Sequence, residues 1–266
     1  MKDDRSTSGQ VGAFADELKS ALLFLTRLPP SLVGGNAVAR PDFTVAARVF
    51  PIVGALVGLA GGITMIVAGL IGLPVLIGAT LGVATTVILT GALHEDGLAD
   101  SADSFGGTTR EAKLAIMDDS RNGTYGTLAL VGSVLLRVAA LAAILPRGPI
   151  LAALALVAGE SVSRAALVRM WHDLPAARTT GLSVETGTPD YSATLVALAF
   201  AAVIVVVTAF PGLGWRPTAL GAVLSVAAAY GAIRLAANTV GGRTGDTLGA
   251  CQQVSLTAFL VGVAVV

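Results

Sequence analysis

The chain has a single cysteine, Cys251, and no excess of charge of either sign. One thiol cannot form an intramolecular disulfide, and a net charge of zero at pH 7 argues against a polybasic surface for nucleic acid. The N-terminal residues lack the apolar stretch of a secretory leader, so no cleaved signal peptide is expected. No Pro-, Gly- or Ser-rich linker and no internal repeat divides the sequence, and we expect one catalytic transmembrane domain over residues 1–266.

Charged residues are scarce altogether, at 13% of the chain, whereas 54% of the residues are hydrophobic. This balance and a mean hydropathy of +0.80 are far from those of a soluble domain. A helix needs roughly 17–25 apolar residues to cross a bilayer. Runs of about that length lie at 50–72, 74–93, 127–145, 149–170, 193–210, 217–237 and 250–266. The sequence therefore predicts an all-α, polytopic integral membrane bundle of about seven transmembrane helices.

A further apolar stretch at 18–30 differs from these runs, because it contains Lys19, Arg27 and the pair Pro29-Pro30. We expect it to form an interfacial or re-entrant helix. With the N-terminus inside, only Arg147 and Arg216 fall in outer loops, whereas most other Lys and Arg residues fall in inner segments. The positive-inside rule then places the N-terminus and the polar loops in the cytoplasm, as for a bacterial inner-membrane protein.

The most informative segment follows the second apolar run and reads His-Glu-Asp-Gly-Leu-Ala-Asp-Ser-Ala-Asp over 94–103. In a helix, Asp96, Asp100 and Asp103 fall at i, i+4 and i+7, on one stripe of the surface. Without a cation these carboxylates would repel one another. Magnesium and manganese take hard oxygen ligands, and magnesium usually binds one or two carboxylates together with substrate phosphates. The stripe therefore predicts a metal site that handles phosphate.

Two other inner loops carry polar residues suited to phosphate. In the loop 117–126, Arg121 could clamp a phosphate, and Asp119 could hold that guanidinium or add to the metal shell. In the glycine-rich loop 241–249, Asp246 is a further candidate metal ligand, and backbone N–H groups beside Arg243 and Thr244 could approach phosphate oxygens. We expect the three inner loops, 94–126, 171–192 and 238–249, to converge at one membrane face.

Charges inside the predicted spans are expected to face the bundle interior, since they are costly in lipid. Glu160 and Arg164 lie at i and i+4 and could form a structural ion pair or line a polar cavity for part of a substrate; Arg137 lies in the preceding span. Trp171, His172 and Asp173 resemble an interfacial belt, and no role is assigned to them.

Five strings resemble the cobalamin synthase family and occur in that family's order. They are Phe-Leu-Thr-Arg-Leu-Pro (24–29), Phe-Pro-Ile-Val-Gly (50–54), the run 91–103 with its His-x-Asp-Gly-x-x-Asp-x-x-Asp core, Asp-Ser-Arg-Asn-Gly-Thr-Tyr-Gly (119–126) and Gly-Asp-Thr-Leu-Gly-Ala (245–250). The resemblance extends over nearly the whole chain. It implies a multi-pass inner-membrane enzyme, adenosylcobinamide-GDP ribazoletransferase, that joins adenosylcobinamide-GDP to α-ribazole or its 5′-phosphate and releases GMP.

The resemblance also implies roles for particular residues. Mg²⁺, or Mn²⁺ as an alternative, would be held by Asp96, Asp100 and Asp103, with Asp246 contributing from the other loop. Arg121 would contact the diphosphate. His94 would accept the proton of the nucleophile, although one of the carboxylates could serve equally well.

Arg178 falls at the family's Pro-x-x-Arg pattern and would bind a substrate phosphate. Three positions depart from the family pattern: Asp118 stands where Lys is common, Leu256 where Glu is frequent, and Glu95 where an apolar residue is usual. The expected partners are the two substrates and membrane lipid; a homo-oligomer stays open, and no nucleic acid is expected.

Two other classes of protein stay open on the sequence alone. A CDP-alcohol phosphotransferase-like lipid enzyme also combines membrane helices with an Asp-rich metal site, but its Asp-Gly-x-x-Ala-Arg continuation is absent because Asp100 follows Ala99. A cation-coupled or proton-coupled transporter would place charges along a pathway through the bilayer. The carboxylates here cluster at one membrane edge, which favours an enzyme.

Overall fold

The computed structural model describes residues 4–34, 42–179 and 186–265, and within them the secondary structure is helical apart from one isolated bridge between Ala176 and Arg243. The predicted loop 171–192 and the predicted span 250–266 each include residues outside this part of the chain. The helices are α1 (Asp4–Leu25), α2 (Phe43–Ala46), α3 (Phe50–Leu70), α4 (Val75–Thr90), α5 (Leu93–Asp103), α6 (Arg110–Met117), α7 (Thr124–Ile144), α8 (Pro149–Asp173), α10 (Tyr191–Leu213), α11 (Trp215–Thr239) and α12 (Gly245–Ala264). The predicted all-α class is confirmed.

Among the residues that the structure describes, six helical segments are long and apolar enough to cross a membrane. They are Phe43–Leu70, Thr124–Arg147, α8, α10, α11 and α12. The helix α4 is too short alone, but together with α5 it forms a pair bent by 90°, which raises the number to seven. Each predicted span coincides with one of these helices, so the polytopic helical bundle is confirmed. Because α5 carries four carboxylates, we place it at the membrane edge, outside the apolar core that α4 enters.

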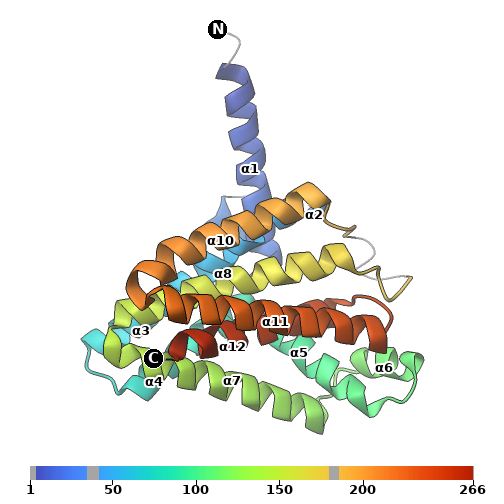
Figure 1. Ribbon diagram of the computed structural model, residues 1–266. Helices are drawn as coiled ribbons and strands as arrows, with labels where there is room; N and C mark the ends of the chain where they lie inside the picture. The colour runs from blue at the N-terminus through green and yellow to red at the C-terminus, as the bar shows by residue number, and fades with distance from the viewer. Residues whose placement is uncertain (1–3, 35–41, 180–185, 266) are drawn as a thin grey trace.

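The N-terminal helix is longer than the sequence pattern indicated. The helix α1 runs from Asp4 to Leu25, so it begins well before the predicted stretch 18–30 and ends ahead of Pro29 and Pro30. Figure 1 shows α1 projecting away from the bundle, with only its C-terminal end against the other helices. It is not among the helices apolar enough to span.

The centre of the bundle is α8, since 72% of its apolar window is buried, against 22% for α11. Small residues permit this close packing. A Cβ on Gly58 of α3 would lie 2.7 Å from the Cα of Val157 in α8, so only glycine allows this approach. The exposed apolar side chains of α10 and α11, such as Val207 and Val226, are suited to lipid.

Candidate active site

A sharp bend brings the acidic helix α5 to the polar end of the bundle. The helix α4 ends at Gly91 and Ala92, which both adopt the left-handed conformation, with φ of 63° and 56°. This conformation is uncommon for a residue with a side chain, so Ala92 marks a strained junction. The chain turns by 90° there and places His94 and Asp96 in the first turn of α5.

Two glycines join α5 to α12. A Cβ on Gly97 would lie 2.8 Å from the backbone oxygen of Asp246, and a Cβ on Gly249 would lie 3.2 Å from the Cα of His94. The backbones of the two predicted metal-binding motifs therefore touch, although about 150 residues separate them in the sequence.

Replacing Gly97 with alanine tests this contact. The added methyl group would meet the Asp246 backbone, which cannot move aside as a flexible side chain would. We expect a loss of about 1–3 kcal/mol in unfolding free energy and a larger loss of activity, because α5 and α12 are pushed apart. The matched control is Gly106→Ala, where nothing lies within 4 Å of the new Cβ. Equal stability and turnover for both variants would contradict the close packing.

The two motifs enclose a cavity of about 320 Å³. Its polar lining consists of His94, Asp96, Arg178, Thr186, Thr244 and Asp246. Its apolar lining includes Phe24, Leu25, Phe50, Leu93, Leu167, Trp171 and Leu248. Among the predicted site residues, the structure thus places one carboxylate from each motif, one guanidinium and the histidine around a single space.

The carboxylates of this region affect one another. Burial, followed by repulsion from Asp96, Asp246 and Asp103, raises the pKa of Asp100 to about 7. Burial and neighbouring negative charges both disfavour the ionised form of a carboxyl group, and a bound cation would favour it. The donor set is the hard-oxygen type that suits Mg²⁺. This observation fits the predicted metal.

Asp103, the third aspartate of the predicted stripe, is hydrogen-bonded to the start of α7. The two carboxylate oxygens of Asp103 accept hydrogen bonds from the backbone N–H groups of Gly123, at 2.7 Å, and Gly126, at 2.8 Å. Asp103 therefore caps the N-terminal end of α7, where backbone donors are otherwise unpaired. A role as metal ligand would have to use the remaining lone pairs of these two oxygens.

Within the described residues, no three His, Cys, Asp or Glu side chains converge closely enough to hold a metal ion by themselves. A magnesium site at Asp96, Asp100 and Asp246 would therefore need oxygen atoms from elsewhere. Substrate phosphates are the usual source of such ligands for Mg²⁺.

The basic residue of the cavity is Arg178, and the departure at position 118 explains how it is held. The Arg178 guanidinium forms an ion pair with Asp118 and donates to the Leu114 carbonyl oxygen at 3.1 Å. Aspartate at position 118 thus holds the cation at the cavity, where a lysine would repel it.

Two predicted substrate-binding residues have structural partners. Arg243 is buried and donates to the Gly187 carbonyl and to Thr188 Oγ1, both at 3.0 Å, so it ties the loop before α10 to the loop before α12. Thr244 forms a capping box with Thr247 at the start of α12 and also donates to Asp246 Oδ2 at 3.2 Å. Thr244 can therefore orient the Asp246 carboxylate.

The predicted phosphate clamp lies apart from the cavity. Arg121 is exposed and forms an ion pair with Asp119, whose side-chain hydrogen bonds from Arg121 lower the pKa of that carboxyl to about 2. Neither residue lines the cavity. Their roles in substrate binding stay predictions that depend on a larger substrate reaching this loop.

The three predicted loops converge, as expected. The backbone N–H of Ala177 donates to the Arg243 carbonyl, that of Arg243 donates to the Pro175 carbonyl, and Arg110 Nη2 donates to the Ala177 carbonyl, each at 2.8 Å. Figure 1 shows α5, α6 and the loop before α12 at the same end of the molecule.

His94 is almost fully buried, with 3% of its surface exposed, and it lines the cavity. Its Nε2 atom has no hydrogen-bond partner in the described part of the chain. Burial, followed by the positive charges of Arg164 and Arg137, lowers the pKa of His94. A neutral imidazole has one nitrogen free to accept a proton.

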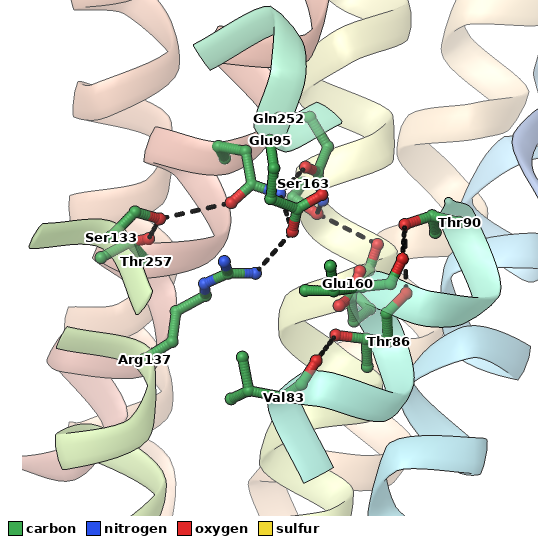
Figure 2. A network of polar contacts seen from close by, with 12 residues as sticks. Val83, Thr86, Thr90, Glu95, Ser133, Arg137, Glu160, Ser163, Gln252 and Thr257 are labelled. Atoms are coloured by element: carbon green, nitrogen blue, oxygen red, sulfur yellow. Dashed lines mark hydrogen bonds and ion pairs between the residues drawn. The ribbon is translucent and has the colours of Figure 1, made fainter. Parts of the chain in front are cut away.

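The sequence did not predict the network of buried polar contacts that joins Glu95 of α5 to α7 and α12. Arg137 Nη1 donates to Glu95 Oε1 at 3.0 Å (Figure 2). Gln253 Nε2 donates to the same oxygen, also at 3.0 Å. Glu95 is therefore the partner of the intramembrane arginine, and its departure from the family pattern supplies one half of a buried ion pair. Nothing in the sequence pairs positions 95 and 137, because that contact depends on how α5 packs against α7.

The predicted ion pair between Glu160 and Arg164 is confirmed, and both side chains are buried. The interpretation of Trp171 as part of an interfacial belt is wrong. Trp171 is 3% exposed, lines the cavity and donates its Nε1–H to the Gly187 carbonyl at 2.9 Å. The polar residues beside it at the helix end suggested an interface, whereas packing against α3 buries the ring.

The fold and the site define a polytopic helical membrane protein with an acidic cavity at one end of the bundle. The chain matches the family CobS, cobalamin-5-phosphate synthase, over residues 17–264. It is 45% identical to the adenosylcobinamide-GDP ribazoletransferase of Azorhizobium caulinodans over 249 residues, 93% of this chain and 94% of that protein. Proteins of the same name from Allorhizobium ampelinum and Brucella melitensis are 41% and 38% identical, over 95% and 94% of this chain and 97% and 96% of their own lengths.

No solved structure matches the chain. The family match covers nearly all of it, so the chain belongs to the cobalamin-5-phosphate synthase family and is a transferase. The resemblance inferred from the sequence is confirmed.

Proposed function

We propose that this protein transfers the phosphocobinamide group of adenosylcobinamide-GDP to α-ribazole, or to its 5′-phosphate. The products are adenosylcobalamin, or its 5′-phosphate, and GMP. The observation that carries this proposal is the contact between α5 and α12, which puts Asp96, Asp246, Arg178 and His94 around one cavity. Relatives bearing the corresponding name cover nearly the whole chain.

In the reaction, a ribose hydroxyl oxygen of α-ribazole attacks the phosphorus that carries cobinamide. A new P–O bond forms, the P–O bond to GMP breaks, and the hydroxyl proton leaves. His94, which lines the cavity and whose Nε2 has no partner among the described residues, would accept this proton, with a carboxylate as the alternative acceptor. Arg178, held by Asp118, would contact the diphosphate charge.

The residues fitted to hold Mg²⁺ are Asp96, Asp100 and Asp246, with substrate phosphates completing the shell. When bound, the metal would neutralise charge on the diphosphate. Thr244 orients the Asp246 carboxylate, and Gly97 keeps the two motifs in contact. Arg121 and Asp119 would contact the part of the substrate that extends beyond the cavity.

The protein would reside in the inner membrane with this end of the bundle in the cytoplasm. The support is the distribution of charge, because the polar loops carry most of the Lys and Arg residues, and the opposite loops carry Arg147 and Arg216.

The direct test incubates purified protein in lipid nanodiscs with adenosylcobinamide-GDP, α-ribazole and Mg²⁺, with and without EDTA. We expect GMP and adenosylcobalamin to form in equal amounts and EDTA to suppress both, as followed by mass spectrometry. A folded protein that forms neither product, with α-ribazole or with its 5′-phosphate, would refute the proposal. Product formation unaffected by EDTA would refute the metal requirement alone.

A further inference from the structure

A long apolar groove lies between α8, α10 and α11, away from the candidate active site. Its volume is about 760 Å³. Figure 1 shows α10 and α11 diverging from the turn that joins them, with α8 visible between them. All three helices line the groove with small side chains, such as Ala165 of α8, Ala201 of α10 and Ala222 of α11. These side chains are too short to fill the space that the diverging helices leave.

The groove is about as long as the apolar part of a bilayer is thick. Its lining residues on α11 run from Trp215 to Ile233, which is about 27 Å along the helix axis, and the hydrocarbon core of a bilayer is about 30 Å thick. Trp215 at one end and Tyr230 toward the other are exposed aromatic residues, a type that gathers where lipid headgroups begin. The groove therefore runs beside acyl chains over its whole length.

The volume of the groove indicates a thin occupant. A helix with its side chains is about 10–12 Å across, so over the same length it fills on the order of 2000 Å³. A helix from a second copy of the chain would thus lie over the groove without filling it. An unbranched acyl chain is much thinner and can lie within it.

The end of the groove nearer the active site carries two opposite charges. Arg169 and Asp173, one turn apart in α8, both line it. Arg169 Nε donates to Asp173 Oδ2 at 2.7 Å, whereas its two Nη groups have no hydrogen-bond partner among the described residues. The two side chains are 44% and 25% exposed, so both are accessible to a ligand. A phosphate can accept from the Nη groups of Arg169, and an ammonium is favoured at Asp173, which ends α8 at the negative pole of its dipole.

We propose that this groove binds one phospholipid of the inner leaflet whose headgroup carries both a phosphate and a primary ammonium, as in phosphatidylethanolamine. The phosphate contacts Arg169, the ammonium contacts Asp173, and an acyl chain lies along Ala165, Ala201 and Ala222. Phosphatidylglycerol has no ammonium for Asp173, and the methylated ammonium of phosphatidylcholine has no N–H to donate. The paired charges therefore select one headgroup, which an ordinary lipid-facing surface does not.

Native mass spectrometry of the delipidated protein tests this selection. Phosphatidylethanolamine, phosphatidylcholine and phosphatidylglycerol with the same acyl chains are titrated separately. We expect one phosphatidylethanolamine per chain to bind at least about 10-fold more tightly than either of the others, because each of them lacks a charge-assisted hydrogen bond. Equal binding of the three lipids would overturn the inference, as would tighter binding of phosphatidylglycerol or no bound lipid.

Substitutions at the headgroup site give a second readout. In Arg169→Gln and in Asp173→Asn we expect the three lipids to bind within about 2-fold of one another, and we expect little effect on folding because the ion pair is partly exposed. The matched control is Arg216→Gln, since Arg216 is an exposed arginine that does not line the groove. A preference for phosphatidylethanolamine that survives both groove variants would refute the headgroup site.

Filling the groove tests the path of the acyl chain. Ala222→Phe places a ring in the groove and is expected to weaken phosphatidylethanolamine binding at least about 10-fold. Ala227→Phe adds the same ring to an exposed position of α11 outside the groove and is expected to leave binding within about 2-fold. Equal binding by the two variants would show that the lipid lies elsewhere.

The same spectra detect the alternative occupant. A dimer that persists without lipid and is lost in Ala222→Phe would assign the groove to a second copy of the chain and overturn the inference. The readout is lipid binding in the absence of both substrates, so this inference and the proposed transfer reaction fail separately.

Discussion

Asp96→Asn is expected to lower kcat about 100- to 1000-fold while leaving the protein folded in the membrane. Asp96 lines the cavity, is exposed to it and makes no ion pair that the fold needs within the described residues. Asparagine keeps the shape of the side chain and removes the negative charge that a cation and a substrate diphosphate require together. Single-turnover formation of GMP by purified variants measures the effect.

The matched control is Glu111→Gln, which removes an exposed carboxylate from α6 at the same end of the molecule. It is expected to retain turnover within about 2-fold. Wild-type turnover by Asp96→Asn would show that the α5 carboxylate takes no part in the chemistry. Asp100→Asn is expected to lose metal-dependent turnover in the same way.

The second large effect is on stability and concerns the buried pair of Glu95 and Arg137. Both side chains are nearly inaccessible, at 9% and 2% exposed, so removing one partner leaves an unpaired buried charge. We expect Arg137→Met to reduce the free energy of unfolding by about 3–5 kcal/mol, measured by denaturation in mixed micelles.

A double variant distinguishes the cost of leaving the Glu95 charge unpaired from the cost of losing the Arg137 side chain. Combining Arg137→Met with Glu95→Leu removes both charges, and we expect most of the stability to return. The control Arg234→Met alters an exposed arginine of α11 and is expected to change stability by less than about 0.5 kcal/mol. If Arg137→Met alone is as stable as the wild type, the buried pair does not hold α5 in place.

Most of the transmembrane helices were predictable from the sequence, because a helix that crosses the membrane needs a long apolar run, and such runs are rare in other kinds of structure. The ends of the helices were less predictable. The break after α4 depends on left-handed Gly91 and Ala92, and an alanine gives no warning of that conformation. The start of α1 at Asp4 also lay outside the apolar stretch that marked it.

In the candidate site, too, some features were predictable from the sequence and others were not. The helical stripe of aspartates and the convergence of three loops followed from periodicity and from charge placement. The capping role of Asp103, the loop-bridging role of Arg243 and the partner of Arg137 depend on contacts between distant segments. Trp171 was misassigned for the same reason, since the sequence around it does not reveal that α3 covers the ring.

The central claim is that a divalent cation binds at the junction of α5 and α12 together with the substrate diphosphate. The most direct test titrates Mn²⁺ into the purified protein and follows its free signal by electron paramagnetic resonance, with and without adenosylcobinamide-GDP. We expect the substrate to tighten Mn²⁺ binding at least about 10-fold in the wild type, and we expect Asp96→Asn or Asp246→Asn to abolish this gain. Equal tightening in those variants and in the wild type would contradict the claim.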